Sequence, residues 1–369
     1  MDKVKNMDLL ECSEYIEDLN NVIKQGIDWE SFRGKTFMIS GATGMIGTFL
    51  IDVLMRLNAE KQLGCSIVAL GRNPKKAQLR FSRYWEDDLF SFHECDISRE
   101  INCDLKKVDY VLHFASNTHP RAYSTDPIGT VTANVIGTYQ LLEFAASHDA
   151  ERFLFASSVE IYGENRGDIK AFTEDYCGYI NCNTLRAGYP ESKRSGEALC
   201  QAFIKQKGLD VVIPRLPRTY GPTLLPTDSK ALSQFLQRGI AGEDIVLKSE
   251  GKQFFSYSYV ADTVSGIFWC LIYGLCGEAY NISDTGSDIS WRDLAGLIAD
   301  ECGTKVVFDL PDDVERQGYS TATVAIMDST KLQGLNWKAH YDIKSGIERT
   351  IRMLKASASN GNLFDRERT

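Results

Sequence analysis

The sequence lacks the features that mark several classes of protein. It contains no long run of basic residues, and its formal net charge of −9 argues against a nucleic-acid groove, although a local positive patch can still hold a nucleotide-sized anion. No segment approaches the roughly 18–20 consecutive apolar residues of a membrane span. The first residues carry no apolar run of the kind found in signal peptides. We therefore expect a cytoplasmic protein without a nucleic-acid or membrane partner.

Cysteine and histidine are present, but not in the patterns that bind metals. The ten cysteines are scattered without a Cys-x-x-Cys pair, and the five histidines form no accompanying cluster. This usage predicts reduced, mostly buried thiols rather than a disulfide framework. We predict no metal site. The chain also has neither an internal repeat nor a low-complexity linker.

What the chain does contain is an alternation of strand-like and helix-like segments. This rhythm predicts an α/β fold, a Rossmann-type doubly wound parallel sheet with a smaller C-terminal α/β substrate lobe. We expect a helical extension over residues 1–31, a dinucleotide-binding domain over 32–216 with contributions from parts of 250–280, and a mainly substrate-binding lobe over 217–369. Strands are predicted near 35–40, 66–70, 91–95, 110–114, 152–156, 210–215, 280–282 and 305–308, and helices near 48–57, 128–148, 189–207, 291–302 and 343–354.

A glycine-rich turn follows the first predicted strand. Gly41, Gly44 and Gly47 are spaced three apart and lead into an amphipathic helix. Strand, glycine turn and helix in this order are typical of dinucleotide binding, because glycine lets the backbone approach the pyrophosphate at the helix N-terminus. Glycines alone also mark ordinary turns, so the order of the elements is what favours a cofactor site.

Tyr189 and Lys193 lie about 150 residues further along the chain, in a segment that we predict to be helical. Residues four apart share one face of a helix. The Lys193 ammonium is then expected to favour the phenolate and lower the Tyr189 pKa, which is otherwise about 10. Such a base suits abstraction of a sugar hydroxyl proton. An exposed helical pair without function is the alternative for this spacing taken alone.

Further motifs accompany these two in the same order as in a known superfamily. They are Asp96-Ile97, His113-x-x-Ser116, Asn134-x-x-x-Thr138, Ser157-Ser158, Arg215-x-x-x-x-Tyr220-Gly221-Pro222 and Tyr259-x-x-Asp262. With the glycine turn and the Tyr189/Lys193 pair, they make residues 33–350 resemble the extended short-chain dehydrogenase/reductases that act on nucleotide sugars as epimerases, dehydratases and decarboxylases. The segment from Glu174 to Arg194 is most similar to the UDP-glucuronate decarboxylase branch.

The resemblance implies roles for individual residues. Tyr189 would be the base toward the sugar 4-hydroxyl, with Lys193, Ser158 and Glu160 completing the catalytic set. The cofactor-binding residues implied are Gly41, Thr43, Gly44, Met45, Ile46, Gly47, Arg72, Asp96, Ile97, Ala115, Ser116, Asn134, Tyr189 and Lys193. The substrate-binding residues implied are Thr118, Arg186, Arg218 and Arg316, with a surface charge as the alternative for Arg316. The reaction would begin by transient oxidation of C4, after which loss of water, loss of CO2 or epimerisation can follow.

Four positions depart from the family pattern. Val159 stands where some dehydratases carry an acidic Asp, and Thr223 where the decarboxylase branch carries an Arg. Arg218 replaces a diphosphate-contacting Asn, and Phe255 replaces an Arg. One anion contact is thus lost and another is gained, because an arginine can hold a phosphate through two parallel hydrogen bonds.

The second strand bears on the choice of cofactor. NAD-binding sheets commonly carry an acidic residue here for the adenosine ribose, whereas this strand is followed by Gly71 and Arg72. Arg72 can pair with a 2′-phosphate, so we expect NAD(P), with NADP slightly favoured. Stacking on adenine or simple exposure is the alternative role for Arg72.

Two other functions are compatible with these residues. One is an NADPH-dependent carbonyl reductase acting on a non-nucleotide substrate. The other is a non-catalytic protein that senses NADP. The intact Ser158, Tyr189 and Lys193 oppose the sensor, and the decarboxylase-like segment 174–194 opposes the reductase.

The two long helices predict how copies of the chain assemble. Related proteins pair the equivalent helices into a four-helix dimer interface, and two-fold homodimers are the commonest oligomers. We expect a homodimer formed through apolar residues of the two helices, or else that these residues only face their own sheet. The residues concerned are Leu141, Leu142, Phe144, Ala145, Leu199 and Phe203.

Overall fold

The computed structural model describes residues 8–103, 105, 107–118, 125–225, 227–309 and 323–358. Its main sheet has eight strands in the order β11-β7-β5-β4-β1-β2-β3, with the short β6 also paired to β7, and all of its strand pairs are parallel. The strands are β1 Thr36–Ser40, β2 Ser66–Gly71, β3 Phe90–Glu94, β4 Tyr110–His113, β5 Arg152–Phe155, β6 Ser157–Ser158, β7 Val211–Leu216 and β11 Ala279–Asn281.

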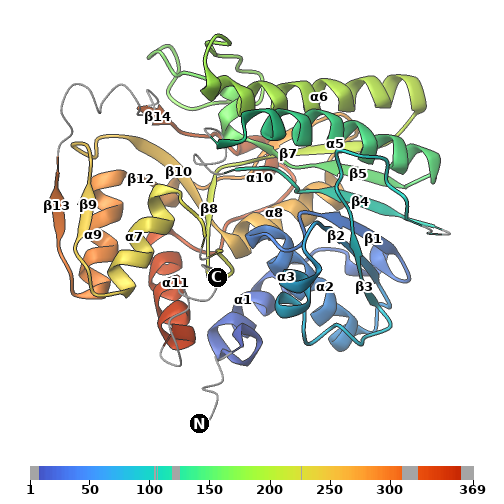
Figure 1. Cartoon of the computed structure of the whole chain (residues 1–369), viewed down its shortest axis with the longest axis horizontal. Coiled ribbons are helices and arrows are strands. Elements are labelled where there is room, and N and C mark those ends of the chain that lie inside the picture. Colours follow the sequence, from blue (N-terminus) through green and yellow to red (C-terminus); the bar gives the residue numbers. More distant parts are fainter. Residues whose placement is uncertain are drawn as a thin grey trace.

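Helices cover both faces of this sheet (Figure 1). α5 Pro127–Ser147 and α6 Gly188–Lys207 run side by side over one face, where Leu141, Leu142 and Phe203 join its core. α2 Met45–Lys61 and α8 Val260–Tyr273 pack on the other face, and α3 Pro74–Arg80 lies near β3. The strand order and the two helical layers are those of a doubly wound Rossmann-type fold, so the predicted fold class is confirmed.

A second lobe is built from the later part of the chain. Its sheets are β12-β10-β14, with β8 on β10, and the pair β13-β9. Its elements are β8 Arg218–Tyr220, α7 Ala231–Ile240, β9 Ile245–Leu247, β10 Phe254–Tyr259, β12 Asp288–Ser290, α9 Trp291–Cys302, β13 Val306–Phe308, β14 Val324–Ala325 and α11 Ile343–Ala358. Between them, α8, β11 and the short α10 Thr330–Gln333 return to the main sheet. We propose that the substrate lobe divides from the sheet near residue 217.

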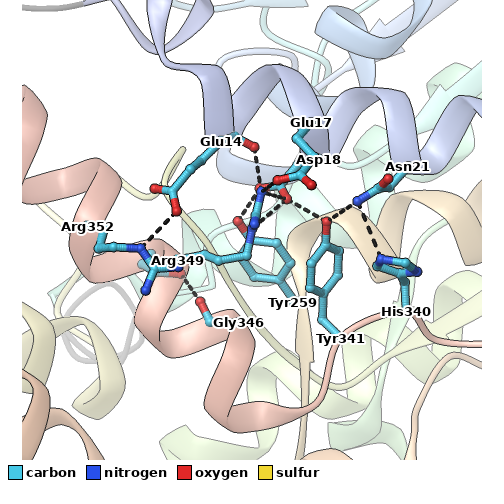
Figure 2. Close-up of polar contacts among 11 residues, drawn as sticks. Glu14, Glu17, Asp18, Asn21, Tyr259, His340, Tyr341, Gly346, Arg349 and Arg352 are labelled. Atoms are coloured by element: carbon cyan, nitrogen blue, oxygen red, sulfur yellow. Dashed lines mark hydrogen bonds and ion pairs between the residues drawn. The ribbon is translucent and has the colours of Figure 1, made fainter.

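The N-terminal extension is helical over α1 Ser13–Ile23 and lies against both parts of the molecule (Figure 1). The Tyr15 hydroxyl donates to Asp52 of α2 at 2.5 Å. On the other side, the fully buried Asp18 accepts hydrogen bonds from Tyr259 at 2.5 Å, Tyr341 at 2.6 Å and Arg349 at 2.8 Å (Figure 2). The extension therefore joins the glycine-turn helix to β10 and to the C-terminal helix α11.

The carboxyls of these joints are strongly desolvated. Burial raises the pKa of Asp18, while hydrogen bonds from Tyr259 and Tyr341 and the charge of Arg349 oppose the rise. Burial likewise raises the pKa of Asp52 to about 7. Buried carboxyls of this kind are stable only while their hydrogen-bond donors remain in place.

Two observations concern the surface and the thiols. Within the described ranges, none of the helices combines the length and the apolar character needed to cross a membrane. All ten cysteines are free; Cys177, Cys182 and Cys276 are exposed, and the other seven are buried or half-buried.

Candidate active site

The glycine turn between β1 and α2 packs too closely against other backbone at Gly41 and Gly47 for a side chain to fit. Gly41 has φ +71°, and a Cβ added there would lie 2.6 Å from the backbone nitrogen of Ala115. A Cβ at Gly47 would lie 2.6 Å from the carbonyl oxygen of Gly41. Thr43 and Met45, at the start of α2, are half-buried. Bare backbone at a helix N-terminus fits the pyrophosphate of a dinucleotide.

The loop after β4 is tied to α6 through buried polar groups. Ser116 donates to Oδ1 of the Asn134 side chain at 2.7 Å, and Nδ2 of Asn134 donates to the Ser192 hydroxyl at 2.8 Å. Because Asn134 has no exposed surface, its expected contribution to the cofactor is to position Ser116 rather than to touch the ligand. His113 is equally buried, between Ser40 and Thr138.

The ends of β2 and β3 bring a carboxylate close to Arg72. Arg72 is exposed directly after β2, and Asp96 follows β3. Two hydrogen bonds from Ser98 lower the pKa of Asp96, and the charges of Arg72 and Arg99 lower it further. Asp96, which follows β3, therefore shares the positive charge of Arg72. Ile97 is buried against Gly137, where an added Cβ would lie 2.7 Å from it.

Tyr189 and Lys193 lie in the first turns of α6, beside the ends of β5 and β6. Both side chains are buried, and the Tyr189 hydroxyl is hydrogen-bonded to Ser158. The Lys193 ammonium donates to the carbonyl oxygen of Ala156 at 2.8 Å. Tyr189 and Lys193 thus share one helix, as their spacing predicted. Ser158, at the end of β6, is the third residue of this group.

The electrostatics of this pair differ from the expectation. Burial raises the pKa of Tyr189 to about 12, the charge of Glu160 adds to the rise, and the Ser158 hydrogen bond and Arg186 oppose it. The Lys193 ammonium is directed at the Ala156 carbonyl. Burial also lowers the pKa of Lys193 to about 8. The pKa of Tyr189 therefore lies above its ordinary value, whereas the helical spacing predicted a lowered one.

The Glu160 carboxylate lies between Arg186 and Arg218, the two arginines predicted to bind the substrate. It belongs to the 3-10 turn Val159–Tyr162, and one of its carboxylate oxygens accepts from Arg186 at 2.8 Å. Its other oxygen lies 3.9 Å from Nη2 of Arg218. The structure therefore brings Ser158, Tyr189, Glu160, Arg186 and Arg218 into one cluster at the carboxyl ends of the central strands.

Three other positions discussed in the sequence analysis are not part of this cluster. Thr118 is half-buried in the loop after β4, and Arg316 lies outside the described residues. Thr223 is buried, and its hydroxyl donates to the Met45 carbonyl oxygen at 2.9 Å. The residue that departs from the decarboxylase pattern at this position therefore fastens the loop after β8 to the glycine-turn helix.

Arg194 and Arg215, which belong to the motifs quoted above but were given no role, hold the loop before α6, where Arg215 donates to the Glu174 carbonyl oxygen at 2.6 Å. Arg194 donates to the carbonyl oxygens of Ile161 at 2.7 Å and Gly178 at 2.8 Å. Arg215 pairs with Glu197 through two hydrogen bonds, at 3.0 and 2.7 Å. The signal in the sequence is a single charged residue in the apolar strand β7, which must have a partner once buried.

Comparison with known proteins agrees with this geometry. Residues 37–283 match the NAD dependent epimerase/dehydratase family. UDP-glucuronic acid decarboxylase 1 of Xenopus tropicalis is 31% identical over 326 residues, which cover 87% of this chain and 72% of the relative. UDP-glucuronic acid decarboxylase 5 of Arabidopsis thaliana is 29% identical over 314 residues, covering 84% and 86%.

Solved structures share the fold at lower identity. UDP-glucuronic acid 4-epimerase from Bacillus cereus, in complex with UDP-glucuronic acid and NAD, superimposes with a TM-score of 0.73 at 23% identity, covering 87% of this chain and 99% of its own. dTDP-glucose 4,6-dehydratase from Bacillus anthracis, in complex with NAD, gives 0.72 at 18% identity, covering 88% and 98%. The chain belongs to the NAD-dependent epimerase/dehydratase family of nucleotide-sugar enzymes.

Proposed function

We propose that this enzyme converts a nucleotide-linked hexuronate, UDP-glucuronate, by oxidation at C4 followed by loss of CO2. The observation that carries the proposal is the cluster in which Tyr189 is hydrogen-bonded to Ser158 beside the Glu160–Arg186 ion pair. Val159 offers no acid for expelling water, which favours decarboxylation over dehydration. The similarity to decarboxylases over most of the chain supports the same reaction.

The residues present fit a dinucleotide, and we propose how they hold it. Gly41, Gly44 and Gly47, with Thr43, Met45 and Ile46 between them, would take the pyrophosphate. Ala115, Ser116 and Lys193 would approach the nicotinamide riboside, and Arg72, Asp96 and Ile97 the adenosine. When bound, the oxidised cofactor accepts a hydride from C4 of the sugar and its reduced form later returns it.

The protein's own residues move and hold protons. Tyr189 accepts the proton of the sugar 4-hydroxyl, assisted by the hydrogen bond from Ser158. The C4 ketone then accepts the electron pair released when the bond between C5 and the carboxylate carbon breaks, which expels CO2. A proton returns to C5, and the later reduction of the ketone takes its proton from Tyr189. Lys193, fixed by Ala156, orients the bound riboside.

Mass spectrometry of the purified protein with UDP-, dTDP-, GDP- and CDP-sugars tests this reaction. We expect UDP-glucuronate to lose CO2 and to yield the UDP-pentose. Loss of water or simple epimerisation as the main reaction would assign a different member of the family. Reduction of non-nucleotide carbonyls by NADPH, with every sugar nucleotide left unchanged, would identify the reductase instead.

The ten free thiols support the cytoplasmic location that we propose.

Arg72 gives a prediction about cofactor choice. We expect NADP+ to bind at least as well as NAD+, and Arg72→Ala to weaken NADP+ more than NAD+, because an arginine can pair with the 2′-phosphate. The selective loss should be about two- to fivefold, since exposed ion pairs contribute roughly 0–1 kcal/mol and Asp96 shares the charge of Arg72. Arg99→Ala is the matched control, since Arg99 also faces Asp96, at 3.9 Å. Calorimetry showing equal losses for both dinucleotides would remove Arg72 from this role.

We also propose a homodimer through the outer faces of α5 and α6. The residues first considered for it, Leu141, Leu142, Phe144, Ala145 and Phe203, are buried and Leu199 is half-buried, all in the core of their own sheet. The apolar side chains available to a partner are others on α5, namely Ile128 (77% exposed), Val131 (37%), Ile136 (41%) and Tyr139 (45%). Two copies of such a face bury apolar surface that a monomer leaves in water.

Light scattering at micromolar concentration checks this assembly. We expect a dimer for the unmodified chain and a monomer for the double variant Ile136→Glu with Tyr139→Glu. Leu79→Glu, on α3 and 82% exposed, is the control and should remain dimeric. A monomeric unmodified chain would reject the dimer.

A further inference from the structure

Arg218 is stacked on an aromatic ring and has a hydrogen-bond donor without an acceptor. Its guanidinium carbon lies 3.6 Å from the centroid of the Phe255 ring, so the group lies over the aromatic face. Nη2 lies 3.9 Å from Glu160, whereas Nη1 is buried and has no hydrogen-bond partner. A buried donor without an acceptor is costly, and the cost disappears when a ligand supplies the acceptor.

Two departures from the family pattern therefore explain each other. β8 and β10 pair in parallel with Arg218 opposite Tyr257, which brings Phe255 within reach of the guanidinium. Phe255 is 2% exposed and gives Arg218 an apolar platform in place of a second positive charge. Compared with the family pattern, β10 lacks a positive charge and β8 has one, which faces Glu160.

The charges of this cluster leave one unit uncompensated. Arg186 and Arg218 contribute two positive charges, and Glu160 contributes one negative charge. Lys193 is directed away, to the Ala156 carbonyl. A group with a single negative charge and two oxygens would neutralise the cluster and give Nη1 of Arg218 its acceptor.

The position of Arg218 indicates which part of the substrate meets it. Its neighbour Glu160 lies two residues after Ser158 in the chain, and the Ser158 hydroxyl is hydrogen-bonded to Tyr189. Arg218 therefore lies near the place where the sugar 4-hydroxyl would meet Tyr189. In a hexuronate the carboxylate carbon C6 is two bonds from C4, whereas the diphosphate is attached to C1, on the opposite side of the ring.

We propose that Arg218, stacked on Phe255, receives the C6 carboxylate of the sugar and selects uronates over neutral hexoses. This inference rests on the proposed function, since it assumes that a nucleotide sugar binds with C4 at Tyr189. It assigns a specificity-determining contact to β8. A neutral hexose in the same place leaves the extra positive charge and the Nη1 donor without a partner.

Binding measurements on the cofactor-loaded chain test the inference. Tyr189→Phe serves as the background that prevents turnover, and calorimetry gives the affinities for UDP-glucuronate and UDP-glucose. Arg218→Gln should weaken UDP-glucuronate by about 10- to 100-fold, the scale of a charge-assisted hydrogen bond, and change UDP-glucose by less than about threefold. Arg292→Gln, which removes an Arg–Phe stack of 5.0 Å on Phe308 outside the cluster, should change neither.

Two further variants keep the test decisive. Arg218→Lys retains the charge without the planar fork and should give a smaller selective loss, which serves where the Gln variant is unstable. Phe255→Leu removes the platform and should weaken the uronate in the same selective way. Equal losses for both nucleotide sugars would place Arg218 at the diphosphate and overturn the inference, as would no loss for either. Failure of the unmodified chain to bind any nucleotide sugar would instead overturn the proposed function, and the inference with it.

Discussion

Tyr189→Phe should lower turnover by about 10²–10⁴-fold, the usual range for loss of a general acid–base group. The substitution removes only the hydroxyl that Ser158 contacts and keeps the ring that fills its buried place in α6. Cofactor affinity should stay nearly unchanged, because Lys193 is held independently by the Ala156 carbonyl at 2.8 Å. Single-turnover kinetics and dinucleotide titration measure the two quantities separately.

A control and a pH profile sharpen this result. Tyr139→Phe removes a hydroxyl from a half-exposed tyrosine on α5 and should leave turnover unchanged. Ser158→Ala removes a hydrogen bond that lowers the pKa of Tyr189, so the rising limb of rate against pH should move to higher pH. Unmodified turnover in the Phe variant would exclude Tyr189 as the base.

Asp18→Ala should lower the free energy of unfolding by about 3–5 kcal/mol, the cost of removing one partner from a buried ion pair. The change leaves Tyr259, Tyr341 and the Arg349 guanidinium, all drawn around Asp18 in Figure 2, without their common acceptor. Denaturant unfolding gives the difference.

Glu17→Ala is the matched control, one residue earlier in the same helix. Its side chain is 59% exposed and also contacts Arg349, so its loss should cost no more than about 1 kcal/mol. If the two variants unfold alike, the buried network does not stabilise the joint between α1 and α11.

The strands of the main sheet and several helices were predicted from the sequence, whereas α7, α8 and β10 were not. The strands of the main sheet and the helices α5, α6, α9 and α11 lie within a few residues of their predicted places. α8 was not predicted, because all residues from Val260 to Leu271 are buried and no polar face marks a period. Likewise β10 is buried from Phe255 to Tyr259.

In the active-site cluster, too, some features were predicted from the sequence and others were not. Tyr189 and Lys193 were recognised together because helical spacing is a local property. That Lys193 meets Ala156, and that Arg218 meets Glu160, depends on strands far apart in the sequence lying side by side. The stack of Arg218 on Phe255 is set by the pairing of β8 with β10, and the sequence gives no register for that pair.

The contact between α1 and α11 also fixes an order of events during synthesis. Asp18 and its partner Arg349 are separated by 331 residues, so α1 leaves the ribosome long before its partner exists. At about 5–20 residues per second the delay is roughly 15–70 s. During that time Tyr15 can dock on α2, whereas Asp18 has neither Tyr341 nor Arg349 to accept from. Completion of the burial of Asp18 in α1 therefore waits for α11.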